Sequence, residues 1–240
     1  MIIGRGGHGE VSLGCFNKAC VYKYAAKRSL VENLSLEYRI NTLAYSIVPK
    51  HVVRPIAFVN GVILSDYVPL SKITPANFKK VLKQVLIALI KLQKAYPSFR
   101  HNDLSWKNVF VTEDGRAYLG DFGLANIEKD GYRNPIIQSN KFKYTHGTYP
   151  NNDPKFDIHF FLNSLILDNV SGLSKMAAQY LPPEYRGVET SKIKMGRLRE
   201  GVSHTSMPTM KQLFSKLKVK NEQASGSRMR KSSGQREGRS

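Results

Sequence analysis

Two acids and an amide in the middle of the chain have the types and spacing that phosphoryl transfer requires. Asp103 and Asn108 are five positions apart, and Asp121 follows 18 residues after Asp103. Transfer of a phosphoryl group from a nucleotide depends on metal ions held against the phosphates and on an acceptor hydroxyl aimed in line. Mg²⁺ takes hard oxygen ligands and usually shares them with substrate phosphates. We therefore expect one acid to orient the hydroxyl, while Asn108 and the second acid, Asp121, hold Mg²⁺.

A glycine-rich stretch near the start of the chain predicts a phosphate site. Residues 3–11 read IGRGGHGEV, with Gly4, Gly6 and Gly9 at alternating and then wider spacing. Glycine lets a backbone approach phosphate oxygens closely and adopt positive φ in a tight turn. Dinucleotide-binding folds use the same spacing but continue into a helix. Here residues 10–14 and 19–23 read instead as two short strands joined by a turn.

Together these segments resemble the eukaryotic-type protein kinase family. Residues 101–108, HNDLSWKN, resemble its catalytic loop H-R-D-x-x-x-x-N, and residues 121–123 match its D-F-G motif. The resemblance implies an α+β fold with a small β-rich N-lobe, about 1–68, and a mostly helical C-lobe, about 69–217. It also implies an ATP-dependent, Mg²⁺-dependent kinase acting on a protein hydroxyl, with Ser or Thr favoured over Tyr. Short strings at 181–187 and 208–210 resemble compact kinases encoded by large DNA viruses.

The resemblance assigns a lysine and a carboxylate to the phosphates. Lys23 falls where the family places its phosphate-binding lysine. Residues 34–43 have apolar side chains at helical spacing, and Glu37 would project from that helix toward Lys23. Glu32 stays an alternative partner, since an acidic residue near a helix start also suits the helix dipole.

The catalytic loop departs from the family pattern in two places. Asn102 replaces an arginine that in many kinases grips a phosphate on the activation segment through charge-assisted bonds. We therefore expect activity that does not depend on phosphorylation of that segment. A lysine usual two residues after Asp103 is missing, and Lys107 stands four residues after it. Lys107 is expected to offset charge that develops on the transferred phosphate, while Asp103 accepts the hydroxyl proton.

Residues 52–59 and 61–68 read as a further hairpin, turning at Asn60-Gly61. It leads into Pro69, which resembles the family's hinge between lobes, whose backbone binds adenine. Phe110 would form the floor of the adenine pocket. The ATP-contacting residues implied in this way are Gly4, Gly6, Gly9, Val11, Val21, Lys23, Asp66, Val68 and Phe110.

Beyond Asp121 the resemblance is thinner. Asp157 resembles the buried aspartate that holds the catalytic-loop amides. Thr148 precedes it by nine residues and no A-P-E motif intervenes, so the peptide-binding platform is trimmed or rebuilt. Two alternatives therefore stay open: a small-molecule kinase of the aminoglycoside or choline type, and a nucleotide-binding pseudokinase. The small-molecule enzymes usually have an acid where Gly123 stands.

Composition limits the location and the partners. The 240 residues are 41% hydrophobic and carry a formal charge of +19, enough for one substantial core with a strongly basic surface. From residue 218 the sequence turns to Ser, Gly, Arg and Lys, which predicts a disordered basic tail. Acidic or nucleic-acid-associated protein substrates and polyanion contact are expected, against the alternative that the charge serves only solubility.

The sequence predicts an intracellular protein. It has no apolar run of about 18 residues that could span a membrane and no signal-peptide pattern at its start. A cytoplasmic location is expected, with a nuclear location or a virion left open. Cys15 and Cys20 would lie on opposite strands of the first hairpin, where a disulfide is conceivable. Reduced thiols are expected instead, since disulfides are rare inside cells.

Overall fold

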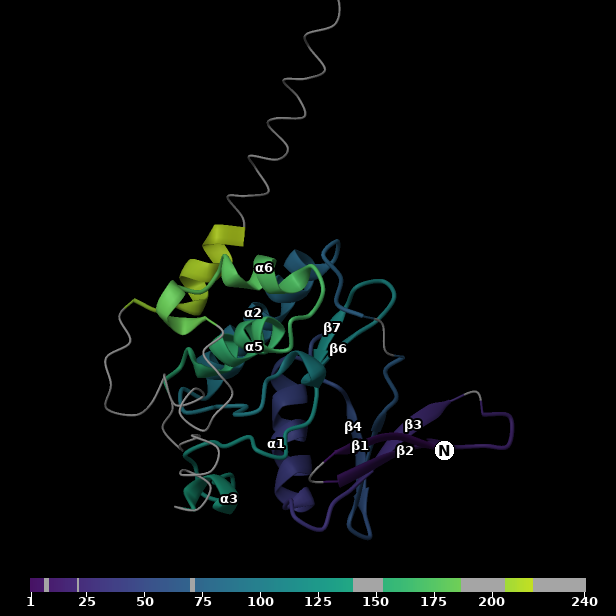
Figure 1. The fold of residues 1–240 in the computed structure, drawn as a ribbon. Coiled ribbons are helices and arrows are strands. Elements are labelled where there is room, and N and C mark those ends of the chain that lie inside the picture. Colours follow the sequence, from purple (N-terminus) through teal and green to yellow (C-terminus); the bar gives the residue numbers. More distant parts are fainter. Residues whose placement is uncertain (7–8, 21, 70–71, 140–152, 187–205, 218–240) are drawn as a thin grey trace, which may run out of the picture.

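A five-stranded antiparallel sheet forms the N-terminal part of the chain (Figure 1). Its strands lie side by side in the order β1-β2-β3-β5-β4. The computed structural model describes residues 1–6, 9–20, 22–69, 72–139, 153–186 and 206–217. In chain order the strands are β1 (Ile2–Gly6), β2 (Gly9–Cys15), β3 (Lys23–Arg28), β4 (Pro55–Val59) and β5 (Val62–Asp66).

The two hairpins that were predicted in this sheet are present, but in one of them the second strand begins later in the sequence than predicted. Asn60 and Gly61 have φ of 49° and 74°, as a two-residue type I′ turn between β4 and β5 requires. The second strand of the other hairpin was predicted at 19–23 and instead begins at Lys23, so that prediction was wrong. The Phe16 ring packs against the rings of Tyr22 and Tyr24 in this turn.

The same turn corrects the prediction of reduced thiols. Cys15 and Cys20 are joined by a disulfide across the base of the turn, with their Cα atoms 4.9 Å apart. Cys20 has a positive φ of 52°, which turns the chain back toward β3. The sequence argument noted that the two cysteines lie on opposite strands of a hairpin, but it gave more weight to the redox environment than to the short distance between the thiols.

Helix α1 (Leu34–Ile47) lies beside the sheet, as its helical spacing predicted. Asn33 caps its start by accepting a hydrogen bond from the Leu36 N–H at 3.0 Å. Leu36, Ile40 and Ala44 form a buried stripe, which fixes the rotation of the helix. Glu37, in the first turn, is buried as well.

Helices and one short hairpin form the rest of the described chain. They are α2 (Phe78–Ala95), the 3₁₀ turn η1 (Trp106–Asn108), β6 (Val109–Val111), β7 (Ala117–Leu119), α3 (Pro135–Gln138), α5 (Phe156–Leu167), α6 (Leu173–Ala178) and η2 (Pro183–Tyr185). Residues 210–217 are helical as well. The apolar face of α2 is buried and its lysines 79, 80, 83, 91 and 94 are exposed, as the amphipathic spacing predicts. Among the described helices, none is long and apolar enough to cross a membrane. The chain is thus a mixed α+β protein, with its sheet at one end and most of its helices at the other (Figure 1).

Backbone hydrogen bonds join the two parts close to the end of β7. Val53 N–H donates to the Leu119 carbonyl at 3.0 Å, and Leu119 N–H donates to the His51 carbonyl at 2.9 Å. Residues 51–53 precede β4, so this pairing ties the sheet to the β6–β7 hairpin. It places Asp121, two residues after Leu119, directly at the junction.

Candidate functional site

A cavity of about 160 Å³ lies at this junction, between the sheet and the β6–β7 hairpin. Its apolar walls come from β1, β2 and β3 on one side and from Phe110 on the other, and its polar end carries Lys27, Glu37 and Asp121. The lining residues are Ile3, Val11, Ala25, Lys27, Glu37, Asn41, Val53, Ile63, Ser65, Asp66, Tyr67, Val68, Phe110, Gly120 and Asp121.

The lysine of this site is Lys27, and the assignment of Lys23 was wrong. The Lys27 Nζ lies 2.9 Å from Glu37 Oε2 and 2.7 Å from Asp121 Oδ1. Lys23 stands exposed at the start of β3 and lines a separate, open groove on the outer side of residues 66–69. Positions 23 and 27 have the same strand parity, so alternation alone could not separate them. The two alanines directly before Lys27 were the available signal, since small side chains leave room for a ligand beside a lysine.

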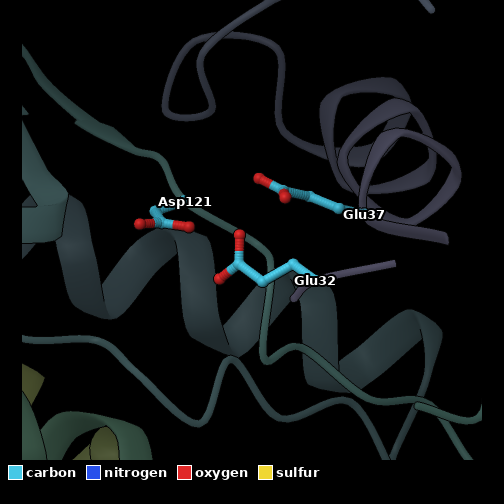
Figure 2. A group of neighbouring side chains, drawn as sticks. All are labelled: Glu32, Glu37 and Asp121. Carbon is cyan, nitrogen blue, oxygen red and sulfur yellow. The ribbon is translucent and has the colours of Figure 1, made fainter. Parts of the chain in front are cut away.

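Three carboxylates converge on Lys27. Glu32 Oε2 lies 2.8 Å from its Nζ, so both acids that the sequence offered as partners contact the lysine. Figure 2 shows the carboxylates of Glu32, Glu37 and Asp121 turned toward one another, with ligand atoms within 4.8 Å of each other. Each of these acids offers a hard oxygen of the kind that a divalent cation prefers.

The excess of negative charge shifts the protonation of this cluster. Burial raises the pKa of Glu37 to about 7, the charge of Lys27 opposes that shift, and Asp121 adds to it. Burial disfavours the charge on Lys27, but Glu37, Asp121 and Glu32 outweigh it and raise the pKa of Lys27. Burial likewise works against the Asp121 charge, yet Lys27 holds the pKa of Asp121 below its usual value. Lys27 and Asp121 therefore form the charged pair, and Glu37 is the group that takes up a proton near neutral pH.

The segment before α1 fixes the position of Glu32. The Ser29 hydroxyl accepts hydrogen bonds from the Val31 N–H at 3.1 Å and the Glu32 N–H at 3.0 Å, closing a tight turn. The Glu32 side chain then reaches the backbone of the D-F-G segment: a Cβ added at Gly123 would lie 2.4 Å from Glu32 Oε1. A side chain at position 123 would therefore displace the Glu32 carboxylate from this position.

Asp103 and Asn108 face each other across the catalytic loop. The Asn108 Nδ2 donates to Asp103 Oδ2 at 3.0 Å and to the Asp103 carbonyl at 2.7 Å. Burial raises the pKa of Asp103 to about 7, and the negative charge of Asp121 adds to the shift, while the Asn108 hydrogen bond opposes it. The site thus holds a carboxyl group that can exchange a proton near neutral pH, with Asp121 close enough to influence it.

Asp157 holds the catalytic loop, as predicted. Its carboxylate is fully buried and accepts hydrogen bonds from the His101 N–H and the Asn102 N–H, both at 2.9 Å. The His101 ring is buried, with Nε2 3.0 Å from the Gly120 carbonyl and its ring centroid 4.8 Å from that of Phe122. These contacts join the loop to both α5 and the D-F-G segment, which fixes Asp103 relative to Asp121.

Lys107 is not brought to the carboxylate cluster. Its Nζ lies 2.9 Å from Asp168 Oδ2 and 5.7 Å from the centroid of the Trp106 ring. The Trp106 Nε1 donates to the same Asp168 carboxylate at 2.8 Å, and the ring packs partly against the core. The side chain of Lys107 is 64% exposed, so its sequence-based role in charge compensation has no support from this arrangement.

The glycine-rich stretch forms the β1–β2 hairpin rather than a strand followed by a helix. Gly4 is opposite Val11 and Gly6 is opposite Gly9 in the antiparallel register. Val11 lines the cavity; Gly9 lines a separate groove beside residues 60–62. Val21 lies outside the described residues, and Ala25 lines the wall for which Val21 had been proposed.

Asp66 and Val68 both line the cavity, as the hinge assignment predicted. The Asp66 carboxylate is held by Arg54, with Nε 2.9 Å from Oδ2, and by a hydrogen bond from the Tyr22 hydroxyl. The Asp66 N–H donates to the Arg54 carbonyl at 2.9 Å. The Asp66 N–H is therefore already used, and the backbone groups that could bind a ligand in this segment are those of Tyr67 and Val68.

Gly120→Ala is expected to destabilise the protein by about 1–3 kcal/mol, the usual cost of overpacking a core. A Cβ at this position would lie 2.3 Å from Phe110 Cε2, so the ring must move. The free energy of unfolding in urea, measured in the native and the Phe110→Leu backgrounds, provides the check. A smaller penalty in the Phe110→Leu background supports the clash, and an equal penalty in both backgrounds contradicts it.

No family model matches this chain, and no curated protein matches it.

Proposed function

We propose that this protein is a phosphotransferase of the protein kinase type, moving the γ-phosphate of Mg-ATP to a Ser or Thr hydroxyl of a protein. The observation that carries the proposal is the meeting of Lys27, Glu37 and Asp121 at one end of an apolar-walled cavity. These residues come from β3, α1 and the segment after β7, and Lys27 and Asp121 are 94 positions apart in the sequence. Glu32 also contacts Lys27, so that three carboxylates surround one ammonium group. This cluster has little structural purpose, because burying three acids around one lysine is costly.

In this proposal Asp103 orients the acceptor hydroxyl and takes its proton. A pKa of about 7 suits a general base, because the group is substantially ionised at neutral pH yet still basic enough to accept a proton. Asn108 holds Asp103 in place through its hydrogen bond, and Asp157 holds the loop beneath both. Lys27 binds phosphate oxygens, with Glu37 and Glu32 behind it to fix the direction of its ammonium group.

The apolar part of the cavity suits the adenine ring. Val11 and Ala25 lie on the side of the sheet, and Phe110 lies on the side of the β6–β7 hairpin. A flat ring between aliphatic and aromatic side chains buries its faces, while the backbone at 66–68 offers polar groups at its edge. We propose that this segment, up to Val68, is the hinge of a kinase-like fold, with the sheet and the helical part as its two lobes.

The residues present fit a magnesium ion. Asp121 and Asn108 offer carboxylate and amide oxygens, and a cation would offset the negative charge of Asp121, which adds to the burial that raises the pKa values of Glu37 and Asp103. When bound there, Mg²⁺ would neutralise charge on the β- and γ-phosphates and so favour their transfer.

The charge of the chain supports acidic acceptors. A formal charge of +19 attracts acidic or nucleic-acid-associated proteins and would bind polyanions. The basic segment 218–240 and Thr148 lie outside the described residues, so the proposal about substrates rests on the total charge and on the lysines of α2.

The test is transfer of labelled γ-phosphate from Mg-ATP to a panel of acidic, basic and neutral proteins, with Asp103→Asn as the matched variant. We expect phosphoserine or phosphothreonine in the acidic substrates, and a rate lower by about 10²–10⁴-fold in Asp103→Asn, the usual range for loss of a general base. Binding of ATP without any transfer, by folded protein, would reject this function in favour of a nucleotide-binding module. Transfer to aminoglycosides or choline but not to proteins would favour a small-molecule kinase.

A further inference from the structure

A run of backbone carbonyls after Phe122 is held from outside the segment. In the stretch 123–126 every carbonyl accepts a hydrogen bond from a residue elsewhere. The Asn134 Nδ2 donates to the carbonyls of 123 and 125 at 2.9 and 3.2 Å, and the Asn102 Nδ2 donates to that of 124 at 3.0 Å. The Arg100 N–H donates to the carbonyl of 126 at 3.0 Å. The stretch directly after the D-F-G motif is therefore anchored at four successive positions.

The asparagines that hold this stretch are themselves buried and connected. Asn102, Asn126 and Asn134 are 1%, 0% and 2% exposed. The Asn126 Oδ1 accepts from the Asn134 N–H at 2.7 Å, and the Asn126 Nδ2 donates to Glu128 Oε1 at 2.6 Å. A buried amide that donates on one side and accepts on the other satisfies its neighbours without introducing charge.

Asparagine also suits the backbone at position 102. Asn102 has a φ of 65°, in the left-handed region that asparagine tolerates better than most residues. Its side chain reaches only as far as the Leu124 carbonyl. The short Asn102 side chain therefore binds the neighbouring backbone. An arginine at this position would be long enough to extend past the Leu124 carbonyl.

Cations near the segment, among the described residues, already have partners. The Arg100 Nη1 donates to the carbonyls of Pro97 and Phe99, and the Lys129 Nζ lies over the rings of Tyr96 and Tyr132. Arg133 is paired with Glu128 at 3.1 Å and lies 3.7 Å from Asp130. Arg39, from α1, lies over the Tyr132 ring at 4.9 Å from its centroid. A segment held in place by an added phosphate needs a cation that can bind that phosphate. The described residues next to this segment hold it by neutral hydrogen bonds instead.

We propose that Asn102, Asn126 and Asn134 are positioning residues that hold Asp121 and its following segment in the productive arrangement without any added phosphate. The proposal rests on the proposed function, because it concerns the regulation of that same site. The asparagines act on Asp121 through the backbone of residues 123–126 and do not touch the reacting groups. The site is thereby assembled permanently by neutral hydrogen bonds.

The sharpest variant is Asn134→Asp. An aspartate keeps the side-chain oxygen that caps α3 by accepting from the Ile136 N–H at 3.1 Å, but it cannot donate to the two carbonyls. Asn102→Asp removes the third donor in the same way. Asn60→Asp is the matched control, because Asn60 also has positive φ but lies exposed in the β4–β5 turn.

Two measurements are made on the full chain. Hydrogen exchange follows the amides of 125 and 126, which donate to the carbonyls of Phe122 and Arg100 at 2.9 Å, with the amides of α2 as an internal reference. We expect exchange at 125 and 126 to be faster by about tenfold or more in Asn134→Asp and Asn102→Asp, with α2 and the Asn60→Asp control unchanged. Loss of protection that is equal throughout the chain, or none at 125 and 126, would overturn the proposal.

Phosphotransfer kinetics provide the second measurement. Wild-type protein treated with phosphatase is expected to keep its rate within about twofold, and Asn134→Asp to lose kcat by about tenfold, with a smaller change in KM for ATP. A phosphatase-treated wild type that loses its activity would overturn the proposal. If the wild type transfers no phosphate, the proposed function fails, while hydrogen exchange still decides whether the asparagines hold the segment.

Discussion

Lys27→Met is expected to lower the free energy of unfolding by about 3–5 kcal/mol at pH 8, the cost of leaving buried charges without their partner. The ammonium is the shared partner of Glu32, Glu37 and Asp121, all within 3.0 Å of it. Methionine keeps the length of the side chain and removes only the charge. Urea unfolding at pH 8 and at pH 5.5 measures the effect, which should be smaller at pH 5.5 because Glu37, whose pKa burial raises to about 7, then carries a proton.

Lys23→Met is the matched control. Lys23 is exposed at the other end of the same strand, so its loss should change the free energy of unfolding by less than about 0.5 kcal/mol. The same pair of variants compares the two lysines in phosphotransfer, where only Lys27→Met should be inactive. Equal effects of the two substitutions, or a larger effect at Lys23, would contradict the assignment of Lys27 to the site.

Asp103→Asn is expected to have opposite effects on activity and on stability. Burial raises the pKa of Asp103 from 3.8 to about 7, so between these values the folded state binds a proton that the unfolded state has lost. The contribution of Asp103 to stability therefore falls as the pH rises from about 4 to about 7, and its penalty is complete above that range. Asparagine cannot ionise and can still accept the hydrogen bond from Asn108, so Asp103→Asn should be more stable than the wild type at pH 8, on the order of 2 kcal/mol.

The measurement is urea unfolding of both proteins without magnesium from pH 4 to pH 8. The difference between them should be small near pH 4 and grow toward pH 8. A variant that is less stable than the wild type at pH 8 would show that the Asp103 carboxylate is favourably solvated or paired in the folded protein. Asp130→Asn serves as the control, since the side chain of Asp130 is 99% exposed.

Local patterns predicted many elements of the fold. The helix beginning at residue 34 and the hairpin at Asn60-Gly61 follow from apolar spacing and turn chemistry. The position of Asp157 beneath the catalytic loop could be predicted as well, although it lies 55 residues after Asn102. This prediction came from the order of the motifs in the family that the chain resembles. A local pattern could not provide it, because residues far apart in sequence carry no local signal of contact.

Other features of the site depend on details that a local pattern does not contain. The turn between β2 and β3 is longer than predicted, and this moved the critical lysine by four positions along the same face of a strand. Lys107 was assigned from its sequence position, but Asp168, at the far end of α5, attracts it. Asn102 was noted as the replacement of an arginine, but Asn126 and Asn134 gave no signal, since an asparagine in a loop is equally typical of an exposed turn.

The pairing of residues 51–53 with β7 has a mechanical consequence. If the sheet rotates against the helices, this short ladder is the natural axis, since its hydrogen bonds at 2.9 and 3.0 Å tie the two parts together. In a rotation, displacement grows with distance from the axis. Lys27 and Asp121 lie close to it, whereas the turn between β2 and β3 lies at the end of the sheet away from α1 (Figure 1). In such a rotation the β2–β3 turn would be displaced furthest, while the paired charges of Lys27 and Asp121 would stay in contact.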